Sequence, residues 1–342
     1  MIRWPAEWAA QDAVLLAWPH EGTDWAENLD QVRACYTALI SSLQPHVKVL
    51  LLVANDQIGR EARTALASRI TPGRLRLLEV PYHDTWLRDS GPISLFDESQ
   101  PVWVDFRFTG WGGKFEASTD DQLIEKLWAL PMFQHLAHRR IDFAVEGGAI
   151  ETDGRGTLLT TWRCLRQRHG SLSEAQLQAT LADALGCDRV FALEHGALEG
   201  DDTDAHIDTL ARFAGRDRII YQGCDDPQDS HYAELQAMAA ELAALRTRDD
   251  QPYQLFALPW APPIHAADGR RLAASYANFL ITNGAVLMPG YGVASDRAAA
   301  EVLAEAFPAH TVVPVPCRPL IEQNGSLHCI TMQLPSGMVG EG

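Results

Sequence analysis

Short apolar runs alternate with longer amphipathic segments along the whole chain. The runs have the length and the Val, Ile and Leu content of buried β-strands, and the longer segments have the 3.6-residue spacing of helices. We predict strands at residues 13–18, 47–53, 75–80, 102–108, 143–145, 157–160, 190–193 and 218–221. We predict helices at residues 28–43, 58–70, 121–130, 171–185, 232–245 and 296–307. This alternation predicts an α/β fold.

Turn and cap residues support several of these boundaries. Asp153-Gly154-Arg155-Gly156 predicts a hairpin turn, and Asn283-Gly284 predicts a second hairpin within residues 279–288. Ser171 and Glu174 have the spacing of a capping box, which predicts a helix start.

The groups of strands and helices recur about every 50 to 70 residues, with no low-complexity linker between them. A chain of 342 residues can bury a substantial core. We therefore expect one catalytic domain over residues 1–342.

Composition and charge narrow the class of protein. Hydrophobic residues make up 46% of the chain, as in ordinary globular proteins, and no apolar run reaches the length of a membrane span. The formal charge of −17 makes nucleic acid an unfavourable partner, because phosphate binding needs a basic face. Six cysteines without C-x-x-C spacing predict reduced thiols in a cytoplasm rather than a disulfide framework.

Cys329 is the candidate nucleophile. A polar turn, Asn324-Gly325-Ser326, leads into residues 327–334, which have the pattern of a short buried strand. A cysteine at such a junction can face a cleft, and a nearby cation would favour its thiolate. His328 would point to the other face of the strand, so it is a poor candidate for the base. The alternative is a buried, inert thiol.

An acidic stretch, residues 199–208, supplies the candidate base. If the stretch is extended, its alternate residues, which include Asp202, His206 and Asp208, share one face. A histidine beside a fixed carboxylate can move protons for a cysteine. A solvated loop is the ordinary alternative. A calcium loop fails because Ile207 stands where the motif requires glycine, and zinc lacks a second histidine, so we predict no metal.

A third segment combines an aromatic ring, a guanidinium and a carboxylate in Trp86, Arg88 and Asp89. A carboxylate beside an aromatic plane can hold a planar guanidinium by paired hydrogen bonds and stacking. The alternative is that Trp86 packs in the core and Asp89 starts a turn.

Two glycine-containing segments can border a pocket. In Glu146-Gly147-Gly148 the glycines allow close backbone approach and the glutamate can meet a ligand's second charge. A bulge with a surface glutamate is the alternative. The segment Gly110-Trp111-Gly112-Gly113-Lys114 lacks the spacing of a phosphate loop and is a candidate pocket wall.

Taken together, these motifs resemble the agmatine deiminases, within the Porphyromonas-type peptidyl-arginine deiminases, a family of enzymes that modify guanidino groups. The segments that carry the resemblance are Trp18-Pro19-His20, residues 85–92, Asp105-Phe106-Arg107-Phe108, residues 111–114, residues 146–148, His206-Ile207-Asp208, Ala211-Arg212-Phe213 and His328-Cys329-Ile330-Thr331. They occur in family order over nearly the whole chain.

The resemblance implies a fold and an assignment of roles. The fold would be the pentein-like, five-bladed α/β propeller with pseudo-repeated units around a central site. Cys329 would be the nucleophile and His206 the general acid and base. Asp89 and Asp208 would clamp the guanidinium, and no metal or organic cofactor would be needed.

Trp86 would pack along the substrate and Glu146 would be a further pocket residue. The chain departs from the family pattern at Gln323-Asn324-Gly325, where three glycines are usual, and at Ser326, where Asn is common. It departs again at Ala205, where glycine often precedes the histidine. These changes stiffen the backbone near the site, so the resemblance implies the chemistry more directly than the choice of substrate.

Three functions remain open. The first is hydrolysis of agmatine, a small cation, to N-carbamoylputrescine and ammonia through a covalent amidino-cysteine. The second is deimination of peptidyl-arginine or another guanidino compound. The third is a binding module without catalysis. A homodimer is the partner that we expect besides the substrate.

Overall fold

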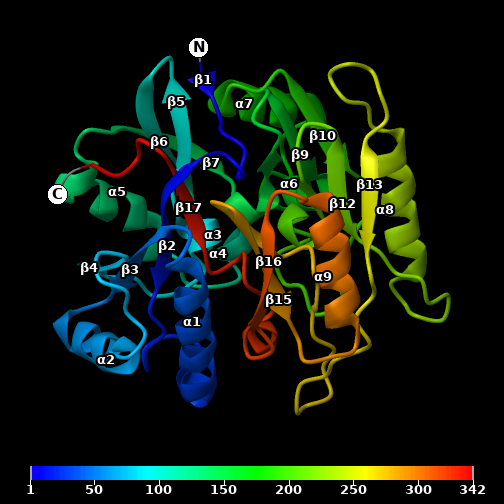
Figure 1. The fold of residues 1–342 in the computed structure, drawn as a ribbon. Coiled ribbons are helices and arrows are strands. Elements are labelled where there is room, and N and C mark those ends of the chain that lie inside the picture. Colours follow the sequence, from blue (N-terminus) through cyan, green and yellow to red (C-terminus); the bar gives the residue numbers. More distant parts are fainter. Residues whose placement is uncertain (1, 341–342) are drawn as a thin grey trace.

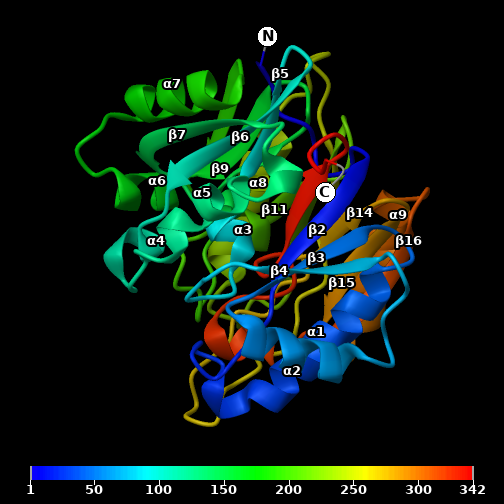
Figure 2. The same ribbon diagram turned by 90° about the vertical axis from the view of Figure 1, so that its left-hand side faces the viewer.

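The structure is a computed structural model and describes residues 2–340. Within this range the strands form five separate sheets (Figures 1 and 2). The first sheet has the order β1-β5-β6-β7 (Ile2–Arg3, Ile93–Asp97, Gln100–Arg107, Ala137–Ala144). The second has the order β10-β9-β8 (Arg189–Leu193, Thr157–Thr161, Glu151–Thr152).

The third sheet has the order β11-β12-β13 (Ala211–Phe213, Arg218–Gln222, Gln254–Leu258). The fourth has the order β14-β15-β16 (Leu280–Thr282, Ala285–Gly290, Thr311–Pro316). The fifth has the order β17-β2-β3-β4 (Met332–Pro335, Gln11–Ala17, Lys48–Val53, Leu75–Glu79).

One pairing pattern recurs in all five sheets. A central strand pairs antiparallel with one neighbour and parallel with the other, and the central strands are β6, β9, β12, β15 and β2. Because parallel neighbours need a long crossover, helices fill the connection. These helices are α5 (Leu123–Trp128), α6 (Trp162–Arg168) with α7 (Glu174–Leu185), α8 (Tyr232–Ala244), α9 (Ser295–Ala306) and α1 (Leu29–Leu43).

The remaining helical elements are shorter or lie outside this pattern. They are α2 (Asp56–Leu66), α3 (Leu87–Ser90), α4 (Gly110–Gly113) and the 3-10 turns η1 (Ala26–Asn28), η2 (Asp120–Gln122), η3 (Pro131–Phe133), η4 (Gly147–Ala149), η5 (Ile207–Thr209) and η6 (Leu320–Gln323). Among residues 2–340, no helix combines the length and the apolar character needed to cross a membrane.

Helices lie outside and the strand ends meet inside. In Figure 1, α2, α5, α7 and α8 lie at the edge of the molecule, whereas α3 and β17 lie near its middle. The central strands carry continuous apolar runs because both their faces are covered; Leu15 and Leu16 of β2 are both 0% exposed. Burying each such side chain contributes about 1.5–3 kcal/mol, which holds each sheet between its neighbours.

In each sheet, the strand that pairs antiparallel with the central strand follows a short connecting segment. These segments are α3 before β5, η4 before β8, η5 before β11, the loop at residues 275–279 before β14, and the turn at residues 327–330 before β17. The repeated pattern brings all five segments toward one place, which positions the site described below.

Most predicted elements are confirmed, with ends that shift by a few residues, and three details are wrong. Residues 327–334 are not one strand: only Met332–Pro335 pairs with β2. The helix cap is Ser173 with Gln176 rather than Ser171 with Glu174. The strand predicted at 143–145 belongs to β7, which pairs with β6, and the hairpin partner of β9 is β8.

Candidate active site

Cys329 lies on the turn before β17 and is buried, with 5% of its surface exposed. Its backbone carbonyl accepts a hydrogen bond from the Arg88 amide at 3.1 Å, so the turn is tied to α3 rather than to a neighbouring strand. The Asn278 side chain donates to the sulfur from Nδ2 at 3.2 Å. The nearer oxygen of Asp208 lies 3.8 Å from Sγ. The thiol therefore faces an amide and a carboxylate.

Asp208 lies beside Cys329 and His206 lies beside Asp89, although the extended arrangement considered for residues 199–208 is wrong. Asp204 and Ala205 have φ values of 68° and 69°, in the left-handed region, and η5 follows directly. This bend turns Asp204 away from the centre toward Lys114, at 2.7 Å. Ala205 takes the left-handed conformation although it is not glycine, the residue that the family pattern often has at this position.

Asp89 is the second carboxylate of the centre. One oxygen accepts from the Trp111 indole at 2.9 Å, and the other accepts from the Gly148 amide at 3.0 Å. His206 Nδ1 lies 3.6 Å from Asp89. Burial is the main cause that raises the pKa of Asp89 to about 6; the charge of His206 lowers it, and the charge of Asp208 raises it further.

Glu146 faces the other side of the His206 ring, with 3.5 Å between Oε2 and Nε2. Its second oxygen accepts from Arg168 Nε at 2.8 Å. Burial opposes ionisation, but His206 and Arg168 lower the pKa of Glu146 to about 2. Burial likewise opposes the charged form of His206, whereas the charge of Asp89, followed by the neighbouring Cys164 and Glu146, raises its pKa well above the usual value. Glu146, Cys164 and His206 also place ligand atoms within 4.8 Å of one another.

Only glycine fits at position 148, because its neighbours leave no room for a side chain. A Cβ atom there would lie 2.6 Å from His206 Nδ1 and 2.8 Å from Asp89 Oδ1. The predicted close backbone approach at this segment is therefore confirmed. Gly325 has the same function against Trp86, because its Cβ would lie 2.4 Å from the indole ring.

His328, which has no place in the predicted site, connects the centre to the N-terminal segment. Its Nδ1 lies 2.8 Å from Asp208 and its Nε2 lies 2.7 Å from Glu7. Carboxylates only accept hydrogen bonds, so both ring nitrogens donate. Burial would raise the pKa of Asp208, but the hydrogen bond and charge of His328 outweigh it and hold that pKa below its usual value.

The same surroundings keep Cys329 protonated when no cation is present. Burial, followed by the charges of Asp208 and Asp89, raises the pKa of the thiol well above its usual value. A guanidinium between the two carboxylates would neutralise that field. The centre is therefore suited to a nucleophile that ionises beside a cationic ligand.

A cavity lined by Cys329 opens toward solvent. Trp86, Trp111 and Phe115 line it. Trp86 packs on Trp25 with 5.3 Å between the ring centroids. The predicted pocket wall around Trp111 is therefore confirmed, and Trp86 lies where a flat ligand can stack.

The mouth of this cavity is acidic. Asp24, Asp84 and Asp202 line it, and among residues 2–340 no Lys, Arg or His does so. Burial is the main cause that raises the pKa of Asp84 to about 7, and nearby Asp120, Asp24 and Asp202 add to the rise. Asp202 accepts from the Asn324 side chain at 2.8 Å. The cavity thus offers carboxylates at both ends.

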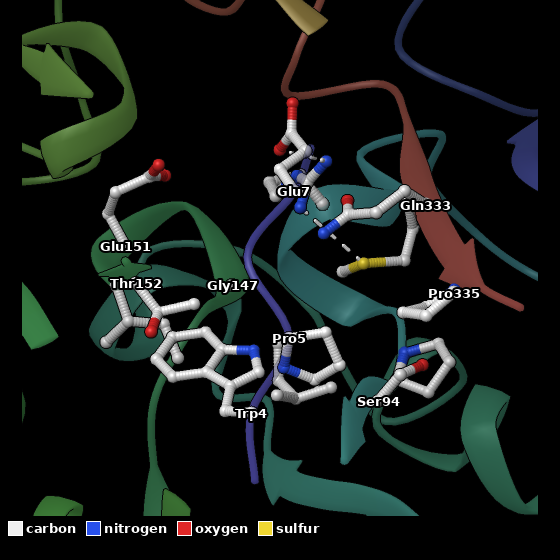
Figure 3. A pocket seen from close by; sticks show the side chains of 14 residues that line it. Trp4, Pro5, Glu7, Ser94, Gly147, Glu151, Thr152, Gln333 and Pro335 are labelled. Atoms are coloured by element: carbon white, nitrogen blue, oxygen red, sulfur yellow. Dashed lines mark hydrogen bonds and ion pairs between the residues drawn. The ribbon is translucent and has the colours of Figure 1, made fainter. Parts of the chain in front are cut away.

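A second cavity lies on the other side of Arg88 and Gly147. Figure 3 shows Trp4, Pro5, Glu151 and Gln333 around it. None of the predicted site residues lines it. The cavity that contains Cys329 is therefore the candidate site.

All six predicted site residues converge around the Cys329 cavity or its floor. They are Trp86, Asp89, Glu146, His206, Asp208 and Cys329. Their assigned roles stay predictions. The sequence analysis assigned no site role to Asn278, Cys164 or Glu7, and it rejected His328 as the base. Asn278 offers one available signal, because it is a polar residue in an apolar run that leads into β14.

Comparison with known proteins assigns the family. The model of the Porphyromonas-type peptidyl-arginine deiminases matches residues 3–335. The chain belongs to this family. The agmatine deiminase of Stutzerimonas stutzeri is 33% identical to this member over 360 residues, which cover 98% of the chain and 96% of the relative.

Two solved structures of the family are similar throughout. One, from Porphyromonas gingivalis and provisionally named an arginine deiminase, is 44% identical with a TM-score of 0.91 and covers 100% of both chains. The other is the C. jejuni agmatine deiminase, a cysteine-to-serine variant with substrate bound. It is 32% identical with a TM-score of 0.91 and covers 98% of this chain and 97% of its own.

Proposed function

We propose that this member of the family hydrolyses agmatine to N-carbamoylputrescine and ammonia. Agmatine carries a guanidinium at one end of a butyl chain and an ammonium at the other. The observation that carries the proposal is the distribution of charge in the Cys329 cavity. Asp89 and Asp208 lie at its floor, and Asp24, Asp84 and Asp202 lie at its mouth.

Asp89 and Asp208 would hold the guanidinium by charge-assisted hydrogen bonds. Trp86 would pack along the alkyl chain. With the cation bound, the Cys329 thiol releases its proton to solvent, and Sγ forms a bond to the central guanidinium carbon.

His206 then acts as the general acid. It gives its proton to one nitrogen, the bond from that nitrogen to the carbon breaks, and ammonia leaves an amidino-cysteine. Glu146 holds the ring in place from the far side. Neutral His206 takes a proton from water as the water oxygen attacks the carbon. The bond between carbon and Sγ breaks, and the ureido product loses a proton to reach its neutral form.

Free or peptide arginine is the second candidate substrate, and the name of the P. gingivalis relative favours it. Arginine would bring a carboxylate toward Asp24, Asp84 and Asp202, and like charges repel one another. The acidic mouth therefore favours an amine over an acid. A binding module without catalysis would use the same clamp but release no ammonia.

We further propose that the five sheets are the blades of one five-bladed α/β propeller and form a single domain over residues 1–342. The shared pairing pattern and the one connecting segment per sheet at the centre support this arrangement. Six free cysteines support a cytoplasmic location. A homodimer stays a prediction, which sedimentation analysis tests.

The deciding experiment measures ammonia release from agmatine, free arginine and a peptide with C-terminal arginine, for the wild type and Cys329→Ser. We expect release from agmatine alone, abolished in the variant. Release from an arginine substrate in preference to agmatine would keep the chemistry and overturn the substrate. Binding of agmatine without release by the wild type would favour the binding module.

A further inference from the structure

We infer that Glu146, Cys164 and His206 form a site for Zn²⁺, and that the bound ion inhibits the enzyme. The inhibition rests on the proposed function, because it follows from the use of His206 as acid and base. The metal binding does not rest on it. Glu146 and His206 directly precede η4 and η5, which lead into the second and third sheets, and Cys164 lies in α6, which follows β9 of the second sheet.

The distances between the ligand atoms suit zinc. Glu146 Oε2 lies 3.5 Å from His206 Nε2 and 4.0 Å from Cys164 Sγ. All three atoms lie within 4.8 Å of one another. Bond lengths of about 2.0–2.3 Å at tetrahedral angles separate ligand atoms by roughly 3.3–3.8 Å, so small side-chain shifts would complete the site. Sulfur, nitrogen and oxygen from three residues with a fourth position open is a donor set that zinc prefers.

The ligand atoms of His206 and Glu146 are not held by any described residue outside this group, so they are free to bind an ion. Both nitrogens of His206 are buried and make no hydrogen bond within residues 2–340, and Nε2 faces Glu146. The oxygen of Glu146 that would bind the ion is not the one that Arg168 holds, since Arg168 Nε donates to the other at 2.8 Å. Arg168 would orient the ligand from outside, as hydrogen-bonded second partners do in metal sites.

The charges of the ligands and of the residues around them can balance the charge of the ion. A thiolate and a carboxylate supply two negative charges to the ion after Cys164 and His206 release their protons. The positive charge of Arg168 is offset by Asp204, at 2.8 Å, and Asp89 lies 3.6 Å from His206. The ion would occupy Nε2, on the Glu146 side of the ring, and a ring bound there can no longer carry the two protons of the acid form, so the ion would stop turnover until a chelator removes it.

Binding can be measured apart from catalysis with Co²⁺ as a probe, because a thiolate bound to cobalt absorbs in the near ultraviolet. The Cys329→Ser protein retains Glu146, Cys164 and His206 but lacks the proposed nucleophile. We expect it to show the thiolate band on titration with Co²⁺ and to lose the band on addition of Zn²⁺. The double variant Cys164→Ser with Cys329→Ser should show no band.

Cys224 supplies the matched control, because it is another cysteine near acidic side chains, including Asp226 and Asp229. Cys224→Ser in the Cys329→Ser protein should leave the band unchanged. A missing band in Cys329→Ser, or a band that persists without Cys164, overturns the site.

The activity assay tests inhibition. Each protein is compared with its own uninhibited rate of ammonia release from agmatine. Cys164→Ala should raise the Zn²⁺ concentration for half inhibition by more than about tenfold, a typical cost of weakening a metal site. Equal sensitivity of Cys164→Ala and the wild type would overturn the inhibitory site. If no guanidine is hydrolysed, the proposed function fails, while the cobalt titration still decides whether the site exists.

Discussion

Asp89 and Asp208 are both buried beside the reacting centre, yet their surroundings differ. Asp208 has the donated hydrogen bond and positive charge of His328, and its pKa is held below the usual value. Asp89 receives neutral donors from Trp111 and Gly148, and burial raises its pKa to about 6. A guanidinium would therefore meet one carboxylate whose pKa lies below its usual value and one whose pKa is raised to about 6.

His328→Gln tests how Asp208 is held. Glutamine carries no charge and replaces only part of the hydrogen bonding that the ring makes to Asp208 and Glu7, so the pKa of Asp208 should rise. A hydrogen bond to a charged group contributes about 1.5–3 kcal/mol, so we expect kcat/KM for agmatine to fall by roughly 10–100-fold. The acid limb of the pH profile should move to higher pH, because Asp208 stays protonated longer.

Steady-state kinetics from pH 5 to 9 measure both effects, and circular dichroism checks the fold. His265→Gln changes an exposed histidine and serves as the control. A fall in kcat/KM without a shift of the acid limb would argue that His328 only supports the local packing.

Asp84 sets a second pH dependence, at the mouth. Its pKa of about 7 means that the carboxylate loses its charge as the pH falls through neutrality, before Asp89 does so near 6. We expect kcat/KM for agmatine to decrease as the pH is lowered across this range. Asp84→Asn should lower kcat/KM at pH 8 and leave an acid limb nearer pH 6. Superimposable limbs for variant and wild type would exclude Asp84 as the titrating group.

At the scale of elements, periodicity identified most strands and helices because burial follows side-chain spacing. It failed at residues 199–208, because the left-handed backbone of Asp204 and Ala205 leaves no trace in the polar pattern. It failed again after Gly325, where an apolar run forms a turn whose backbone bonds to Arg88. Local pattern cannot report a partner that lies far away in the chain.

The same limit explains which site residues could be predicted from the sequence. Cys329, His206 and Asp89 stand out because their residue types carry chemistry wherever they occur. Glu7 and Asn278 act only through contacts, since Asn278 touches Cys329 from 51 positions away in the sequence. Such residues become visible only when the segments before the strands are brought together.

The η4 segment gives a prediction at this scale. Gly148→Ala would place a methyl group 2.6 Å from His206 Nδ1, so either the ring or the segment must move. We expect kcat to fall by about 100-fold or more, because displacements near 1 Å at a reacting centre have effects of that size. Gly170→Ala is the control, since the atom nearest to its new Cβ would be the Arg166 carbonyl oxygen at an ordinary 3.6 Å. Ammonia release measures both; similar rates for the two variants would contradict the argument.

At the scale of the whole molecule, Arg212 joins parts of the chain that are far apart in sequence. It is 0% exposed and donates to Glu7 at 2.8 Å and to Glu151 at 2.7 Å. It also donates to the Phe279 carbonyl at 2.8 Å. These partners belong to the N-terminal segment, the second sheet and the approach to the fourth sheet. The buried charges therefore fix the positions of the segments around the centre relative to one another.

Arg212→Met should destabilise the fold strongly, because it leaves Glu151 buried without its ion-pair partner and removes one of the cationic partners of Glu7. Removing one partner of a buried ion pair costs about 3–5 kcal/mol, and we expect the free energy of unfolding to fall by that amount. Urea denaturation followed by tryptophan fluorescence measures it. Arg60→Met breaks an exposed pair with Asp56 and should change stability by less than about 0.5 kcal/mol. Equal effects of the two substitutions would contradict a structural role for the buried cluster.

The fifth sheet pairs β17 with β2, so the last strand of the chain lies beside one of the first (Figure 1). Cys329 precedes that last strand. During synthesis residues 1–328 must therefore be made before the sulfur can meet its partners. A prematurely terminated product would carry the histidine and both carboxylates but lack the nucleophile, so incomplete chains would be inert toward the guanidines of the cell.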